Sequence, residues 1–328
     1  MQNKISSKDI SVVVQGDIDS RYIKKCLNSI RQYLPEAEIV LSISKEEEVK
    51  IDGLSYDRLV LVDDPGAVKL NKESDKLNNI NRQIIGTKEG LLQTTRLYVL
   101  KFRTNMCLTG NTFLRLYENL VDNAVYFNYK ILALDYYTRN PRVVPLPFYL
   151  SDWILFGRAE DVKKYYNSVD FQDLIECLWY ENHENLSPIF PQVLARYTPE
   201  QHIFLSWLAK EEQVKISEYY DNNKENIDMT ERIIGQNFII LDLLSSDMQF
   251  LKYNPNRYYE SITLLTFKDW KIINKKYAGL SEISSIEWNF YRLKCYFRYL
   301  IFFYIRGSMC WLVNRLGFRT WIKRFIEK

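Results

Sequence analysis

One apolar segment constrains the fold of this chain more than any other. Residues 97–100 are apolar, Lys101 and Arg103 follow them, and the apolar pattern resumes at residues 106–108. A short continuous apolar run of this kind is typical of a buried strand in a parallel sheet. In an open α/β sheet, ligands bind beyond the carboxyl ends of the strands. We therefore expect residues 98–105 to contain a central strand whose carboxyl end carries the chemistry.

Strand and helix patterns alternate around this segment. Short β-branched runs have the composition of buried strands, and the segments between them have apolar residues at helical spacing. Such alternation predicts an α/β fold with a doubly wound, mostly parallel sheet flanked by helices. The expected strands include 10–14, 38–44, 58–62 and 238–241, and the expected helices include 21–33 and 79–95.

Charge is distributed unevenly along the 328 residues. The net charge is only +3, but residues 288–328 contain nine Lys or Arg, one Glu and 13 aromatic residues, for a formal charge of +8. We therefore divide the chain into a main domain, residues 1–280, and a helical basic-aromatic tail, residues 281–328. Basic, aromatic-rich amphipathic helices bind the interface of anionic membranes, which is the function we favour for the tail. A helical cap packed on the main domain is the alternative, and nucleic-acid binding is disfavoured.

The sequence lacks the marks of several protein classes. Five scattered cysteines and two histidines have no metal-ligand spacing, so we expect no structural zinc and reduced thiols, as in a cytosolic protein. The longest uncharged apolar run near the end, residues 299–305, is far shorter than the roughly 20 residues of a membrane-spanning helix. No phosphate-binding loop, nucleophile elbow or dinucleotide fingerprint is present, which disfavours NTPase, hydrolase and dehydrogenase functions.

Polar and glycine residues gather at the predicted strand ends. Because parallel strands end at one edge of a sheet, we expect these residues to meet in one crevice. A glycine lets a ligand approach the backbone closely, and two cations on one side of a strand suit a diphosphate. The alternative is that the two cations are solvated edge residues paired with Asp63 or Asp64. The set comprises Gln15, Gly16, Ser44, Asp64, Lys101, Arg103 and Asn105.

Two other segments could contribute to a ligand site. Asn81 and Arg82 lie at a predicted helix N-terminus, where free backbone N–H groups and the added charge favour an anion; a plain Asn cap is the alternative. Asp152 and Trp153 lie inside an apolar run, where an acid and an aromatic ring could hold a sugar by hydrogen bonding and stacking. A buried Asp that caps a backbone turn explains this second pattern equally well.

A carboxylate is expected on the first turn of a later helix. This helix begins at Pro199, with Thr198 as its N-cap, and Glu200 follows. An acid that projects from a helix start can act as a general base towards an acceptor hydroxyl. The alternative, which the residues by themselves favour, is a Glu placed there by the helix macrodipole.

Taken in order, these segments resemble the WavE family of lipopolysaccharide-synthesis proteins, a family of expected GT-A-type glycosyltransferases. No single segment is specific, but their order along the chain is, and the resemblance covers about residues 9–275. It is carried by residues 12–16, 26–31 with 34–35, 64–66, 81–84 with 90–91, 98–105, 151–153 with 156–157, and 199–201.

The resemblance implies a GT-A-like, Rossmann-type fold and the transfer of a sugar, with inversion, in lipopolysaccharide or capsule biosynthesis. The implied partners are a nucleotide-sugar donor and a glycan or lipid-linked glycan acceptor, and the implied location is the cytoplasmic face of the inner membrane. The strand-end set, with Asn81 and Arg82, then becomes the donor site. Glu200 and Asp152 become the catalytic candidates, and Trp153 and Gln201 are expected to bind the acceptor.

The chain departs from the family at one point. In GT-A enzymes, the strand that matches residues 98–105 usually ends in an Asp-x-Asp triplet that holds a divalent metal, whereas residues 103–105 are Arg-Thr-Asn. Because Mg²⁺ and Mn²⁺ prefer carboxylates, either the metal is dispensable and Lys101 or Arg103 neutralises the leaving diphosphate, or an aspartate at 63–64 supplies the ligand. Sugar-phosphate transfer is a variant of this function. A non-catalytic scaffold that binds nucleotide or glycan in a polysaccharide-assembly complex is the alternative.

Overall fold

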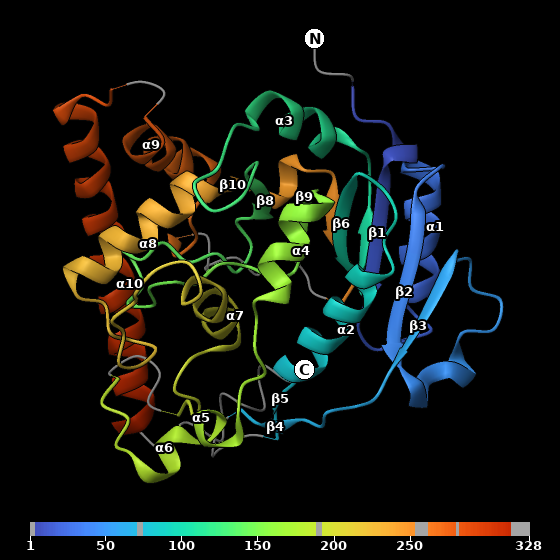
Figure 1. Cartoon of the computed structure of the whole chain (residues 1–328). Helices are drawn as coiled ribbons and strands as arrows, with labels where there is room; N and C mark the ends of the chain where they lie inside the picture. The colour runs from blue at the N-terminus through green and yellow to red at the C-terminus, as the bar shows by residue number, and fades with distance from the viewer. Residues whose placement is uncertain (1–3, 71–74, 188–191, 253–261, 280–281, 316–328) are drawn as a thin grey trace.

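The computed structural model describes residues 4–70, 75–187, 192–252, 262–279 and 282–315, with the backbone alone for 305–307 and 309–315. Its main feature is a seven-stranded sheet of order β10-β8-β9-β6-β1-β2-β3 (Figure 1). All its strands are parallel except β9, which runs antiparallel between β6 and β8. The predicted α/β class with a mostly parallel, Rossmann-like sheet is thus confirmed. The strands are β1 (Ile10–Gln15), β2 (Glu38–Ser44), β3 (Arg58–Val62), β6 (Tyr98–Arg103), β8 (Ile131–Leu134), β9 (Leu155–Arg158) and β10 (Phe238–Leu241).

Helices cover both faces of this sheet. In Figure 1, α1 lies behind the sheet while α2 and α4 lie in front of it, and α8 and α9 pack together beside β10. The longer helices are α1 (Ile23–Tyr33), α2 (Ile80–Leu92), α3 (Thr112–Leu120), α4 (Ala159–Asn167), α7 (Pro199–Leu208), α8 (Lys224–Asn237), α9 (Phe267–Tyr277) and α10 (Ser285–Arg315). The shorter elements are α5 (Leu174–Cys177), α6 (Trp179–Asn182), the 3₁₀ helices Ser7–Asp9, Lys45–Lys50 and Leu243–Ser245, and the two-stranded sheets β4 (Val68–Lys69) with β5 (Leu77–Asn78) and β7 (Met106–Leu108) with β11 (Met248–Phe250).

A glycine brings α2 close to the sheet. A Cβ atom added at Gly90 would lie 2.5 Å from Cγ1 of Val13 in β1, a separation that no side chain tolerates. The apolar face of α2, including Ile84 and Leu91, is fully buried against the strands. Because α2 runs from the carboxyl edge of the sheet back along β1 and β2, its N-terminus lies at the edge where we expect the ligand site.

The segment expected to form the central strand does so. Strand β6 pairs with β1 on one side and with β9 on the other, and Val99, Leu100 and Phe102 are fully buried. The strand ends at Arg103, and the chain turns at Thr104 and Asn105 before β7 starts a separate small sheet. The apolar run that resumes at residue 106 therefore belongs to a different element.

The first half of the predicted tail is docked on the main domain. In α10, Tyr291 and Cys295 are completely buried, and the Tyr291 hydroxyl donates to Oε1 of Glu231 in α8 at 3.1 Å. Arg298 forms an ion pair of 2.7 Å with Asp269, a buried residue of α9. The proposed domain boundary at residues 280–281 lies outside the described residues, so the division at that point stays a prediction. Within the described ranges, no helix has both the length and the apolarity needed to cross a membrane.

Candidate functional site

The ends of β1, β2 and β6 meet as the sequence predicts. Gln15 is aligned with Ser42 of β2 on one side and with Arg103 of β6 on the other. Gly16 follows with φ of +129°, and a Cβ atom there would lie 2.9 Å from Oγ1 of Thr104. This threonine hydroxyl donates to the backbone oxygen of Asp17 at 2.8 Å. The close approach of the two strand ends therefore requires glycine at position 16.

Lys101 and Asp152 form a fully enclosed ion pair beside these strand ends. The Lys101 ammonium donates to Oδ2 of Asp152 at 3.1 Å and also to the Asp152 backbone oxygen, and both side chains are at most 3% exposed. Burial lowers the pKa of Lys101 to about 8, although the Asp152 carboxylate opposes this shift. Lys101 is thus committed to Asp152 and does not face solvent. Its direct contact with a donor stays a prediction.

Arg103 is held differently, by an aromatic ring. Its guanidinium carbon lies 4.2 Å from the ring centroid of Trp153, within the range of a cation–π contact. Across the residues whose side chains are described, Arg103 has no carboxylate partner. It is partly exposed, unlike Lys101. Arg103 therefore keeps its charge and its N–H donors available at the carboxyl edge of the sheet.

Glu200 lies on the first turn of α7, next to the same ion pair. Desolvation of this partly buried side chain raises its pKa to about 7, and the charge of Asp152 acts in the same direction. A hydrogen bond from the Tyr149 hydroxyl and the charge of Arg139 oppose the shift. The carboxyl of Glu200 has no cation in direct contact within the described part of the chain. It can therefore take up and release a proton near neutral pH.

Sequence reasoning missed two residues of this group. Tyr149 is buried and hydrogen-bonded to Glu200, and Arg139 lies over the rings of Tyr149 and Tyr137, 5.9 and 5.5 Å from their centroids. Both belong to the irregular connection between β8 and β9. No spacing in the sequence links this connection to Glu200, because only the fold brings α7 against it.

The residues predicted around α2 stabilise loops at this edge. Arg82 forms a two-point ion pair with Asp64, with Nε to Oδ1 at 2.7 Å and Nη2 to Oδ2 at 2.5 Å. The pair holds the pKa of Asp64 below its usual value. Asn81 exchanges two hydrogen bonds of 2.9 Å with the backbone of Gln172. These contacts connect the end of β3, the start of α2 and a distant loop; the donor-binding roles of the three residues stay predictions.

Gln201 and Trp153, the expected acceptor-binding residues, are both buried. The Gln201 amide donates to the backbone oxygens of Pro147 and Tyr219, at 2.7 and 2.8 Å, and its carbonyl accepts from Thr198 at the start of α7. These bonds satisfy the side chain and fix α7 against the connection that carries Tyr149. Trp153 is 7% exposed. The contacts that Gln201 and Trp153 make in the structure are with other parts of the protein. Their acceptor-binding roles stay predictions.

Several buried polar atoms at this edge have no hydrogen-bond partner among the described residues. Those near the strand ends are Nε2 of Gln15, Oγ of Ser42, Oγ of Ser44 and Oδ1 of Asn105. Buried polar atoms are normally paired, so unpaired ones concentrated at one edge indicate a place where a polar ligand or water completes the bonding. Three of these residues, Gln15, Ser44 and Asn105, belong to the predicted strand-end set.

The donor atoms at the end of β6 do not fit a divalent-cation site. Mg²⁺ and Mn²⁺ prefer several carboxylate oxygens. Of the nearby carboxylates, Asp152 is paired with Lys101, Asp64 with Arg82 and Asp63 with Lys45. No group of three or more His, Cys, Asp or Glu side chains in the described ranges could hold a metal ion. We therefore derive no step through a metal.

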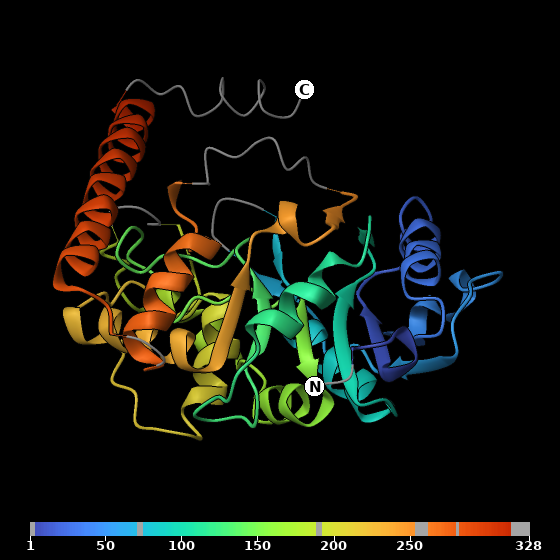
Figure 2. The ribbon, with the colours of Figure 1, turned by 90° about the horizontal axis from the view of Figure 1, so that it is seen from above.

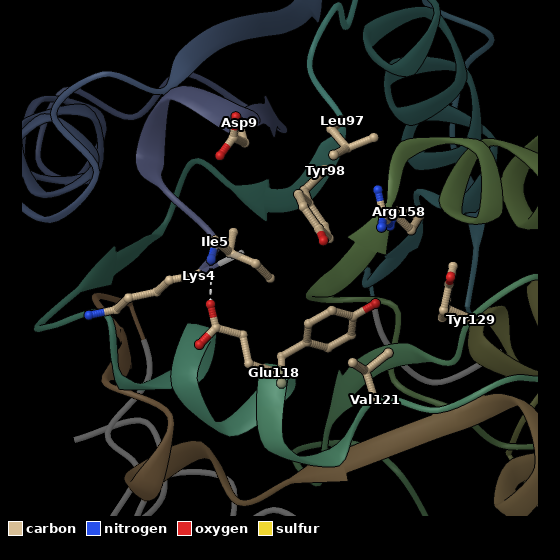
Figure 3. Close-up of a pocket in the computed structure, with 10 residues that line it drawn as sticks. Lys4, Ile5, Asp9, Leu97, Tyr98, Glu118, Val121, Tyr129 and Arg158 are labelled. Carbon is tan, nitrogen blue, oxygen red and sulfur yellow. Dashed lines mark hydrogen bonds between the residues drawn. The ribbon is translucent and has the colours of Figure 1, made fainter. Parts of the chain in front are cut away.

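A cavity of about 360 Å³ lies at the opposite edge of the sheet (Figure 3). It is bounded by Asp9, which precedes β1, by Tyr98 at the start of β6, and by Arg158, which lies over the rings of Tyr98 and Tyr129. The amino ends of the parallel strands meet here, whereas the predicted site lies at their carboxyl ends. None of the predicted site residues lines this cavity.

Fold and site together define an α/β protein with a Rossmann-like sheet and a polar, partly cationic site beyond the carboxyl ends of its central strands. The chain belongs to the WavE lipopolysaccharide synthesis family, whose model matches residues 10–300. The resemblance inferred from the sequence is thereby confirmed, and with it a role in lipopolysaccharide biosynthesis.

Two further comparisons add little to this assignment. The chain is similar to the crystal structure of 4-diphosphocytidyl-2C-methyl-D-erythritol synthase from Anaerococcus prevotii DSM 20548. The identity is 15%, the TM-score is 0.32, and the match covers 69% of this chain and 97% of the other. No curated protein matches the chain significantly.

Proposed function

We propose that the chain transfers a sugar from a nucleotide-sugar donor to a glycan acceptor during lipopolysaccharide assembly. The observation that carries the proposal is the position of Glu200. A carboxyl group with a pKa of about 7 and no directly contacting cation lies beside an enclosed ion pair, at the edge of the sheet where Arg103 keeps its charge available. A proton acceptor and an anion-binding cation at the same edge of the sheet are the pairing that transfer from a diphosphate-linked sugar requires.

Glu200 acts as the general base in this proposal. The acceptor hydroxyl oxygen attacks the anomeric carbon of the donor sugar while Glu200 takes its proton. The bond from the anomeric carbon to the diphosphate oxygen breaks, and the electron pair leaves with the nucleoside diphosphate. This single displacement inverts the anomeric configuration. A base works best when its pKa is near the working pH, a condition that the desolvation of Glu200 provides.

Arg103 stabilises the leaving diphosphate. Charge accumulates on the diphosphate oxygens as the sugar–oxygen bond breaks, and a guanidinium can bind two of them through parallel N–H donors. Lys101 is enclosed with Asp152, so it acts indirectly. It fixes the Asp152 carboxylate, whose negative charge acts on Glu200. Asp152 then tunes the base and does not itself contact the substrate.

Transfer is tested by following nucleoside diphosphate release from a panel of nucleotide sugars with lipopolysaccharide-derived acceptors. Glu200→Gln removes the base without changing the size of the side chain, and we expect the rate to fall by roughly 10²–10⁴-fold. Glu225→Gln is the matched control, because Glu225 also lies on the first turn of a helix, α8, but is exposed. Turnover at the wild-type rate in Glu200→Gln would exclude this assignment.

The donor nucleotide is identified by thermal shift. A ligand that binds only the folded protein raises its melting temperature, so UDP, GDP, CMP and dTDP are compared, each with and without Mn²⁺. We expect a selective shift that does not require Mn²⁺, since cations hold the diphosphate. A shift that appears only with Mn²⁺ would mean that a carboxylate binds metal at the donor site. The absence of any shift in folded protein would exclude the donor site.

A non-catalytic scaffold is the second candidate function. It is favoured by Asn105, which stands where the family has a metal-binding carboxylate and whose Oδ1 has no hydrogen-bond partner among the described residues. A scaffold would bind nucleotide or glycan and release no nucleoside phosphate. Slow hydrolysis of the donor without acceptor therefore separates the two functions, because only an enzyme produces nucleoside di- or monophosphate.

We also propose that α10 binds an anionic membrane surface. Among the described side chains of this helix, eight apolar or aromatic ones are exposed, and six of these, from 45% for Ile301 to 83% for Ile286, form a stripe. They follow each other at intervals of three or four residues, so they share one face, opposite the face that buries Tyr291 and Cys295. Figure 2 shows α10 along one side of the molecule, with its later residues extending past α8 and α9. The residues of this apolar stripe are Ile286, Phe290, Leu293, Phe297, Ile301 and Tyr304.

Charge complementarity selects a membrane with anionic lipids as the partner. Residues 288–328 carry nine cationic residues and one Glu; Lys294 and Arg298 are paired with Asp269, and each other Lys or Arg near such a surface adds about 1 kcal/mol of attraction. Phe290→Ser/Phe297→Ser interrupts the apolar stripe without touching the docked face, and we expect less co-sedimentation with vesicles that contain phosphatidylglycerol. The control is Leu174→Ser/Ile175→Ser, two exposed apolar residues of α5. Unchanged sedimentation of the Phe290→Ser/Phe297→Ser protein would contradict the proposal.

A further inference from the structure

The ring of Trp153 is enclosed by other aromatic rings. It stacks on Tyr137 with 5.6 Å between centroids and 12° between planes, and it meets the edges of Tyr136 and Phe250 at 5.5 and 4.8 Å. With 7% exposure, the side chain has little surface for a sugar to cover. The contacts therefore point away from acceptor binding and towards a role inside the protein.

The charged group in contact with this ring is Arg103. Two other cations at this edge, Lys101 and Arg82, each have a carboxylate partner, whereas the Arg103 guanidinium rests on the Trp153 ring at 4.2 Å. A carboxylate would fix a guanidinium too, but it would neutralise the charge and occupy the N–H donors. The face of an aromatic ring fixes the guanidinium and leaves its five in-plane donors free for an anion.

The backbone supports the orientation of the Trp153 ring. Tyr137 has φ of +61°, an unfavourable conformation for a residue with a side chain. With this backbone conformation, the ring of Tyr137 stacks flat on the ring of Trp153. Phe250 comes from β11, which pairs with β7 directly after the turn that follows Arg103. Phe250, which packs on the Trp153 ring, is therefore connected through β11 and β7 to the strand that carries Arg103.

We propose that Trp153 is a positioning residue that fixes Arg103 for the donor diphosphate, and that it does not bind the acceptor. The inference rests on the proposed function, since it assigns Arg103 to the diphosphate. Loss of the Trp153 ring would leave Arg103 charged but free to rotate. The protein would then lose diphosphate affinity while the base, Glu200, is unaffected.

The probe is inorganic pyrophosphate, measured by calorimetry on the full-length protein. Arg103→Gln should lower the pyrophosphate affinity at least tenfold and reduce the dependence of affinity on salt. Trp153→Leu should lower the affinity to a similar extent, and Trp153→Phe, which keeps an aromatic face, should retain most of it. Arg103→Gln/Trp153→Leu should bind no more weakly than Arg103→Gln alone, because Trp153 acts through Arg103.

A control variant tests for a general packing effect. Phe113→Leu removes another buried aromatic ring, which packs on Phe156 away from this site. It should lower the melting temperature without changing pyrophosphate affinity. A purely structural role of Trp153 would give the same pattern for Trp153→Leu. Wild-type affinity in folded Trp153→Leu, alongside a loss in Arg103→Gln, would overturn this inference and leave the donor site intact.

A second measurement applies if Trp153→Leu does not fold. Site-specific replacement of Trp153 by di-, tri- and tetrafluorotryptophan keeps the shape of the ring and progressively weakens its attraction for a cation. We expect pyrophosphate affinity to fall with each added fluorine, and equal affinities across the series would overturn the inference. If wild-type protein binds no pyrophosphate, or Arg103→Gln binds it as tightly as wild type, the proposed donor site itself fails.

Discussion

Asp152, which is buried, and Glu200, which is partly buried, are two acids of one site with different surroundings. Asp152 has the ammonium of Lys101 at 3.1 Å, whereas the carboxyl of Glu200 accepts hydrogen bonds from a backbone N–H group and from the Tyr149 hydroxyl and has the more distant charge of Arg139. The carboxylate of Asp152 is thus bound by a cation. A carboxylate without one can exchange a proton near neutral pH. In the proposed mechanism, Lys101 therefore distinguishes Asp152, which it holds, from Glu200, which acts as the base.

The largest expected effect is on the Lys101–Asp152 pair. Lys101→Met leaves the Asp152 carboxylate buried without a partner, which should lower the free energy of unfolding by about 3–5 kcal/mol. Lys101→Met/Asp152→Leu removes both charges and should recover most of the stability. Urea unfolding of the two variants measures the difference. If the double variant is as unstable as Lys101→Met, the loss of stability comes from altered packing and not from the unpaired charge.

Glu200 should show the opposite behaviour in a stability experiment. Its pKa is about 7 in the folded protein, above the value of 4.5 that is usual for a Glu side chain, so its ionisation weakens folding as pH rises from about 4.5 to 7. Glu200→Gln should therefore raise the free energy of unfolding at pH 8 by up to about 3 kcal/mol, with a smaller gain at pH 5. Urea unfolding at both pH values measures the gain. An equal gain at both would mean that the titration of Glu200 is not its cause.

The contrast between these two acids could not be predicted from the sequence, although the strand that organises the site could. The apolar run before Lys101 indicated a buried strand because burial on both faces requires apolar residues. The position of Glu200 on a helix start followed from Thr198 and Pro199. What pairs with Lys101 depends on how the irregular connection between β8 and β9 folds back. No periodic pattern encodes that path.

The same limit explains the predictions for Arg82 and Trp153. A cation at a helix start is compatible with an anion site, but the sequence does not reveal that Asp64, at the end of another strand, already binds it at 2.5 Å. An aromatic residue in an apolar run is compatible with sugar stacking until the rings that enclose it are known. Local pattern thus indicates where a polar residue lies, while tertiary contacts determine whether it is available.

If Glu200 is the base, as we propose, Asp152 also sets the pH at which it acts. Transfer needs the ionised carboxylate, so the rate should rise with pH through about 7. Asp152→Asn removes the negative charge that raises the pKa of Glu200, so the rising limb of the pH–rate profile should move to lower pH by about 1 unit. A profile measured from pH 5 to 9 tests this shift. An unchanged profile would place the titrating group elsewhere.

Tyr149 provides the smallest and most specific test, because its effect has the opposite sign. Its hydroxyl donates a hydrogen bond that favours the ionised form of Glu200, so Tyr149→Phe should raise the pKa of this carboxyl and move the rising limb to higher pH by about 0.5 unit. The matched control is Tyr180→Phe, whose hydroxyl bonds Glu218 at 2.6 Å, away from this site. If the pH–rate profiles of Asp152→Asn and Tyr149→Phe shift in opposite directions, the titrating group must interact with both side chains. Glu200 meets that condition. Shifts in the same direction would break the contrast between the two acids, because one general effect on the site would then explain both.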